Sequence, residues 1–166
     1  MGLLLPLVWV TPQAEANGAA VCAISGTIDF TPSTALPSQG QWRIEPAVIN
    51  CQGIYRGYQY FTAPGSFAGR GTYTDLPGKG GCLHQVGKGD LDYRLTTTEA
   101  DLHFEEPGQF VLAGAGAFTT PSLNGTIQMT PPYEGDCLSA PVTRATFFAQ
   151  ALMVRVNGAA LDPGFP

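Results

Sequence analysis

The fold is decided by two neighbouring stretches, LDYRLT at residues 91–96 and DLHFE at residues 101–105. In each stretch, apolar and polar residues alternate with a period of two, which is the pattern of a β-strand with one buried and one solvated face. Only a short polar segment separates the two stretches. They therefore predict an antiparallel hairpin.

Similar patterns recur along the chain between Gly and Pro residues. WRIE at residues 42–45 alternates, and QFVL at 109–112 leads into a Gly- and Ala-rich stretch that ends at Phe118. The run from 145 to 156 suits either a helix or a central strand covered on both sides, and we predict a strand because nothing else in the chain has a helical pattern. With 21 Gly, 14 Pro and 13% charged residues among 166, the composition disfavours helices. The expected fold is all-β, a single antiparallel β-sandwich or barrel.

A threefold repeat is the alternative architecture. GTIDFTP at 26–32, GTYTDLP at 71–77 and GTIQMTP at 125–131 all fit G-T-x4-P. A strand that opens at Gly and ends at Pro explains this motif without any repeat. Three related units would instead indicate a β-trefoil.

The N-terminal segment resembles a secretory signal. Residues 3–10 are apolar but too few to span a bilayer, and Ala14 and Ala16 have the spacing of a signal-peptidase site. No Lys or Arg precedes the apolar run, so a retained segment is the alternative. We expect a signal or retained segment at 1–16, one β domain at 17–157 and a C-terminal tail at 158–166. The protein is expected to be secreted, with no stable membrane span.

Four widely spaced cysteines predict two disulfides in an exported chain. Three pairings are possible, and we favour Cys22 with Cys51 and Cys82 with Cys137, because sequence neighbours often lie side by side in antiparallel sheets. No C-x-x-C occurs and the two histidines are not spaced as zinc ligands, so neither a metal nor another cofactor is expected.

Most catalytic patterns are missing from the sequence. The chain has no G-x-S-x-G motif, and His84, in a Gly-rich segment, is the better candidate of the two histidines for a hydrolase. Asp90 and Asp92 share one strand face, whereas the adjacent residues Glu105 and Glu106 must point to opposite faces. With 8 Lys and Arg and a net charge of −5, nucleic-acid binding is not expected. We predict a protein that is not an enzyme.

Aromatic residues provide the densest recognition-like feature, since Tyr and Arg are enriched where proteins bind partners. The binding candidates are Trp42, Tyr55, Arg56, Tyr58, Tyr60 and Phe61.

The chain also resembles small secreted β-proteins of actinobacteria. The resemblance rests on the C-x3-G-T-x2-F-x-P opening from Cys22, the G-D-C that ends at Cys137, and the P-V-T-R-A that follows it. It implies a secreted β fold and allows an adaptor role in a secreted particle, with no catalytic residue to carry over.

The predicted function is that of a non-enzymatic structural or adaptor subunit of an extracellular protein assembly. Its partners would be other secreted subunits or copies of itself. The alternatives are a free glycan- or small-ligand-binding module and, third, a small secreted hydrolase.

Overall fold

The predicted alternation produces strands throughout the part of the chain that the computed structural model describes. That part comprises residues 20–34, 39–55, 59–76, 84–113, 115–135, 142–156 and 159–160. The strands are β1 (Ala20–Thr34), β2 (Gln39–Tyr55), β3 (Gln59–Asp75), β4 (Gln85–Thr97), β5 (Asp101–Val111), β6 (Ala115–Thr119), β7 (Leu123–Glu134) and β8 (Val142–Met153). Two short strands follow, β9 (Arg155–Val156) and β10 (Ala159–Ala160). Within these residues there is no helix of the length and apolarity that crossing a membrane requires.

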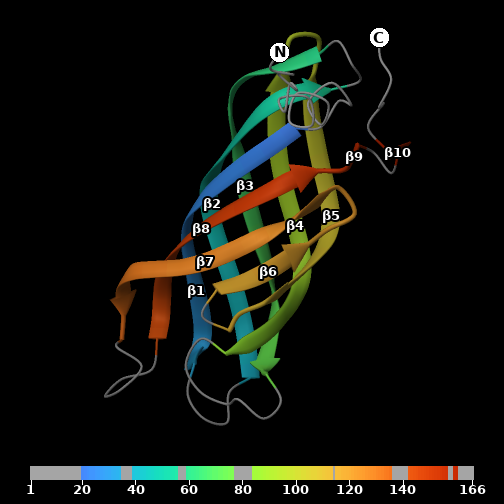
Figure 1. Cartoon of the computed structure of the whole chain (residues 1–166). Coiled ribbons are helices and arrows are strands. Elements are labelled where there is room, and N and C mark those ends of the chain that lie inside the picture. Colours follow the sequence, from blue (N-terminus) through green and yellow to red (C-terminus); the bar gives the residue numbers. More distant parts are fainter. Residues whose placement is uncertain are drawn as a thin grey trace, which may run out of the picture.

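The strands β1 to β8 form one closed barrel in chain order (Figure 1). Each strand is antiparallel to the next, and β8 returns to pair with β1. The predicted hairpin is confirmed as β4–β5, with an unbroken register from Val86↔Val111 to Thr96↔Asp101. The strand predicted at 145–156 is confirmed over most of its length as β8. Of the two all-β architectures expected, the barrel is the one formed.

The trefoil alternative is wrong. The three G-T-x4-P segments start at different places, near the middle of β1, near the end of β3 and near the start of β7, and these are strands of one meander rather than equivalent parts of three units.

The barrel interior is an apolar core. Along β4, Leu91, Tyr93 and Leu95 are buried while Asp92 and Arg94 are exposed, and the other strands alternate similarly. An inner cavity between Trp42, Phe110 and Phe147 has a volume of only about 30 Å³. That volume is about one water molecule's share of liquid. The interior around these aromatic residues is therefore filled by side chains, as is common for eight strands.

Two glycines allow β3 and β4 to approach closely on the inner side. A Cβ on Gly71 would lie 2.0 Å from the carbonyl oxygen of Lys88, and one on Gly89 would lie 2.1 Å from that of Arg70. The Trp42 side chain lies against this close approach, where its indole N–H donates to the carbonyl oxygens of Thr72 at 3.1 Å and Lys88 at 3.3 Å. The polar edge of a buried tryptophan is thereby satisfied.

The disulfide predicted between Cys22 and Cys51 is confirmed. The two residues face each other across the β1–β2 ladder, and both are buried in the core. Cys82 and Cys137 lie outside the described residues, so their pairing stays a prediction.

Candidate functional site

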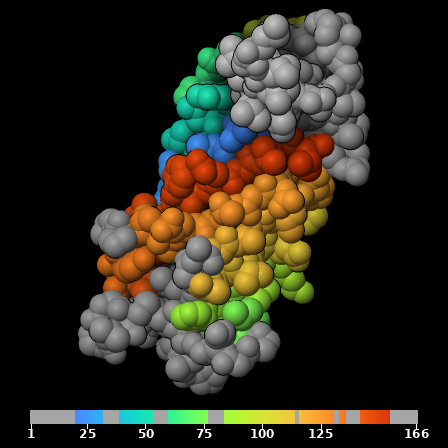
Figure 2. Space-filling model, in the orientation of Figure 1, coloured from blue at the N-terminus to red at the C-terminus, as the bar shows by residue number. Residues whose placement is uncertain are grey.

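One side of the barrel has an outer surface without charge, which we call the uncharged face. It is formed by the outward side chains of the N-terminal parts of β1 and β7 and the C-terminal parts of β2 and β8, and Figure 2 shows β7 in orange, β8 in red and β1 in blue as neighbouring bands. Its residues are Val21, Ala23, Ser25, Val48, Asn50, Gln52, Asn124, Thr126, Gln128, Phe148, Gln150 and Leu152.

Large apolar side chains are exposed on the uncharged face. The exposed fractions are 49% for Val21, 51% for Val48, 41% for Phe148 and 51% for Leu152. The register explains their proximity: Ser25 pairs with both Val48 and Phe148, and Val21 pairs with Leu152. Apolar residues from three adjacent strands therefore gather in one patch.

The outer surface of β4 and β5, which we call the charged face, is the opposite in chemistry. Its outward ionisable side chains are Lys88, Asp90, Asp92, Arg94, Asp101, His103 and Glu105. The His103 Nε2 atom lies 2.9 Å from Asp92 Oδ1 and 3.6 Å from Glu105 Oε1. As predicted, Asp90 and Asp92 share this outer face.

A groove of about 1080 Å³ crosses the outer wall from β1 to β6 beside the charged face. Arg43, Arg70 and Lys88 supply basic groups to its lining, and Asp90 supplies an acidic one. A neighbouring hollow of about 700 Å³ shares Arg43, Arg70 and Asp90 and adds further carboxylates. The larger groove is as voluminous as a small-molecule site, which typically encloses about 300–1,000 Å³.

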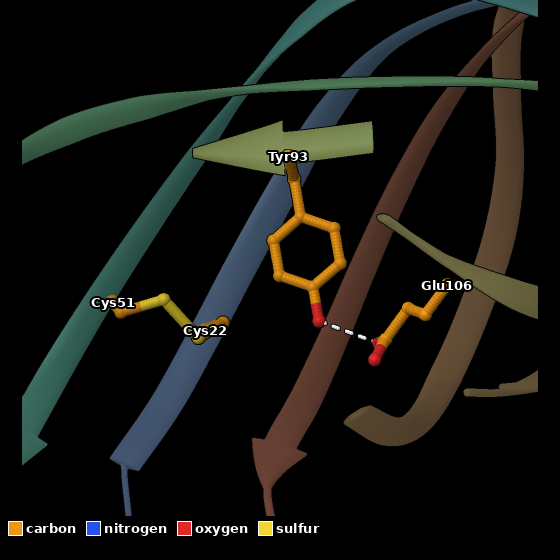
Figure 3. Close-up of a disulfide and its surroundings, with 4 residues drawn as sticks. All are labelled: Cys22, Cys51, Tyr93 and Glu106. Carbon is orange, nitrogen blue, oxygen red and sulfur yellow. Dashed lines mark hydrogen bonds between the residues drawn. A yellow bond between two sulfur atoms is a disulfide. The ribbon is translucent and has the colours of Figure 1, made fainter. Parts of the chain in front are cut away.

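Inside the barrel, a cluster of hydroxyl groups surrounds the carboxylate of Glu106. The Tyr93 hydroxyl donates to Glu106 Oε1 at 2.6 Å (Figure 3), and Ser122 Oγ donates to Oε2 at 2.8 Å. Thr120 Oγ1 also donates to Oε1. Burial raises the pKa of Tyr93, and the hydrogen bond and negative charge of Glu106 raise it further. The phenol therefore remains a proton donor to the carboxylate.

The Glu106 cluster reinforces the shortest junction in the barrel wall. The β5–β6 ladder runs only from Gln109↔Thr119 to Val111↔Ala117, and Glu106 lies on β5 beyond its end. Through Thr120 and Ser122 its carboxylate binds the turn between β6 and β7. We interpret the cluster as structural, because the hydroxyl groups that donate to the carboxylate lie on β4 and on the turn between β6 and β7, on either side of β5 in the barrel wall.

The aromatic binding candidates are separated by the fold. Trp42 is buried, Tyr60 is exposed, and Phe61 packs against the core. Tyr55 ends β2, but its side chain, like residues Arg56 and Tyr58, lies outside what the structure describes. The structure thus brings no pair of these side chains together within its described part.

The remaining sequence candidates also have defined places. His84 precedes β4, and its carbonyl oxygen accepts a hydrogen bond from the Leu76 N–H at 2.7 Å. Glu105 points outward and Glu106 inward, as predicted.

Sequence reasoning missed the uncharged face and the Glu106 cluster. Glu106 shares its strand face with Leu102 and Phe104, which was the available signal of an inward carboxylate. The sequence contains the uncharged outward residues of this face, but their proximity to one another follows only from the strand register.

The fold and the surfaces define the chain as a closed, up-and-down, eight-stranded barrel with an apolar interior and two chemically different outer faces. No protein-family model matches it, and no curated protein does. Among solved structures, the crystal structure of Neisserial surface protein A (NspA) matches with 13% identity and a TM-score of 0.22, over 82% of this chain and 96% of that one. So slight a likeness carries no inference about fold or function.

Proposed function

We propose that this protein is a secreted, non-enzymatic binding protein that acts as a subunit of an extracellular protein assembly and contacts its partner through the uncharged face. The observation that carries the proposal is the apolar patch of Val21, Val48, Phe148 and Leu152, without a charge among its outward neighbours. The cores of protein interfaces are depleted of charged residues in the same way. An exposed apolar patch is also a liability for a monomer and a recognised mark of an interaction site.

The filled interior supports a role for the outer surface. Eight-stranded barrels that carry a ligand inside need an empty chamber. Here the inner cavity of about 30 Å³ is too small for anything but water.

An aqueous, oxidising location is consistent with the described residues. The Cys22–Cys51 disulfide is typical of proteins from oxidising compartments. Charged side chains point outward along β4 and β5, where contact with lipid would be costly. These two observations support the proposal of a protein in the extracellular medium.

The test is the mass of the native species, measured by light scattering after purification of the tagged full-length gene product from culture medium. We expect an assembly for the wild type and dissociation for Val48→Asp and Phe148→Asp. Val111→Asp is the matched control, because Val111 is also an outward strand valine, 39% exposed, but lies on β5. It should leave the assembly intact.

Two results would overturn the proposal. One is a monodisperse wild-type monomer, and the other is an assembly that persists in both uncharged-face variants when circular dichroism shows them folded. Mass spectrometry of the same sample identifies the components and the N-terminus, which tests the predicted leader directly.

A second candidate function is binding of an anionic glycan or another small anion in the large outer groove. The specific observation is the presence of Arg43, Arg70 and Lys88 in a single lining. Calorimetry against carboxylated oligosaccharides should detect binding that Arg70→Ala weakens at least tenfold. Equal affinity in wild type and variant would reject the groove as the site.

A further inference from the structure

The charged face contains three side chains arranged as metal ligands. Asp92, on β4, lies directly opposite Glu105, on β5, and His103 precedes Glu105 by two residues on the same outward face. One ligand atom from each residue lies within 4.8 Å of the other two. The three residues come from two strands with an unbroken register, so the backbone fixes their relative positions.

Two of the three ligand separations are close to those of a tetrahedral metal site. With metal–ligand bonds of about 2.1 Å, two ligands of a tetrahedral zinc ion are about 3.4 Å apart. The His103–Asp92 and His103–Glu105 distances, 2.9 Å and 3.6 Å, lie on either side of this value. The contact between His103 and Asp92 is a hydrogen bond in the metal-free protein, and an ion would replace it.

From this geometry we infer that Asp92, His103 and Glu105 bind a divalent transition-metal ion, with zinc as the best match. One imidazole and two carboxylates suit zinc, whereas calcium prefers six or more oxygen ligands. All three side chains are solvent-exposed, so water completes the coordination.

The core beneath the site holds it rigid. Tyr93 and Phe104 form a ladder pair immediately inside these ligands, and their rings stack with centroids 4.6 Å apart and an interplanar angle of 8°. Tyr93 follows Asp92 in sequence, and Phe104 separates His103 from Glu105. Buried aromatic packing therefore anchors the backbone on both sides of the ligand set.

The local charge also favours a dication. Like charges directly opposite each other in an antiparallel pair are unfavourable, and Asp92 and Glu105 are such a pair. A divalent ion between them replaces repulsion with attraction. Arg94, the ladder partner of His103, opposes this effect, while Asp90 on the same face adds to it.

Isothermal titration calorimetry of the full-length protein with ZnCl₂ tests the site. We expect one ion per chain, and an affinity that falls at least tenfold in His103→Gln and in Asp92→Asn. His84→Gln is the matched control, because it removes the other of the two histidines in the chain and should change the affinity by less than twofold. Asp101→Asn is the control for an outward carboxylate on the same strand.

A titration with CaCl₂ should show binding at least a hundredfold weaker than that of zinc. Asp92, Asp101 and His103 are exposed and His84 is half-buried, so metal-free unfolding midpoints within a few degrees of the wild type will show that the variants are folded. Absence of zinc binding by the wild type, or a loss in His84→Gln that equals the loss in His103→Gln, would overturn the inference.

Discussion

Two regions of the barrel share the same alternation of inward and outward residues but differ in the chemistry of their outward side chains. On the uncharged face, around the N-terminal part of β1 and the C-terminal parts of β2 and β8, the outward positions are uncharged and partly apolar, and the inner wall is crossed by a disulfide. Around β4 and β5 the outward positions carry charges of both signs, and the inner wall contains the Glu106 cluster. Folding depends on the inward half of each pattern, so the outward half is where the two regions can differ in function.

The two regions also differ in how the contact between neighbouring strands is reinforced. The β1–β2 ladder is long and is reinforced by a covalent bond. The β5–β6 ladder is short, and hydrogen bonds from side chains to Glu106 extend the junction. The disulfide and the Glu106 hydrogen bonds can each be removed by substitution, so the contribution of each to the free energy of unfolding can be measured.

Loss of the disulfide should have the largest effect. Cys22 and Cys51 are separated by 29 residues, for which the chain-entropy model gives a stabilisation of about 3.6 kcal/mol. We expect the variant with both Cys22→Ala and Cys51→Ala to lose roughly 3–4 kcal/mol of unfolding free energy. Chemical denaturation under non-reducing conditions measures this difference, and a loss below about 1 kcal/mol would contradict an entropic role for the bond.

Removal of the Glu106 carboxylate should have the next largest effect. Glu106→Ala leaves the buried hydroxyls of Tyr93, Thr120 and Ser122 without this acceptor, at a cost of about 2–3 kcal/mol. Glu105→Ala is the control next to it in sequence, and because Glu105 points outward its effect should stay within about 0.5 kcal/mol. Equal effects in the two variants would show that the cluster adds nothing to the junction.

Alkaline pH should lower the free energy of unfolding through Tyr93, the hydrogen-bond donor to Glu106. Burial and the neighbouring carboxylate raise the pKa of Tyr93 above its ordinary value of 10.0. Below pH 10 both folded and unfolded chains keep this proton, so the stabilisation is complete. As the pH rises above 10, the unfolded chain loses the proton while the folded chain retains it, and the unfolding free energy falls.

The contribution of Tyr93 to this slope is at most about 1.4 kcal/mol per pH unit. Urea denaturation between pH 9 and 11 should show a shallower slope for Tyr93→Phe than for the wild type. Tyr60→Phe, which changes an exposed tyrosine, is the control. Parallel slopes for wild type and Tyr93→Phe would contradict the raised pKa.

Local alternation predicted the β4–β5 hairpin. The strand at β8 was predicted because no other part of the chain has a helical pattern, and the Cys22–Cys51 disulfide because sequence neighbours often lie side by side in antiparallel sheets. Alternation alone was not sufficient for either. It did not decide between sandwich and barrel, because closure depends on the pairing of β8 with β1, which are far apart in sequence. The composition of the outer faces could not be predicted for the same reason. Val48 and Phe148 are neighbours only through Ser25, and Asp92 meets Glu105 only in the register of the folded hairpin.

The smallest expected effect concerns the carboxylate pair of the charged face. Replacing Glu105 with Lys converts a like-charge ladder pair into one of opposite charge, which should stabilise the metal-free protein by about 0.2–1 kcal/mol. The same Glu105→Lys variant removes a zinc ligand and should lose zinc affinity. Denaturation with and without zinc measures both quantities in one variant. A higher stability together with weaker zinc binding would indicate that the wild-type charged face sacrifices stability to keep its zinc ligands. A lower stability of the metal-free variant would contradict repulsion between Asp92 and Glu105.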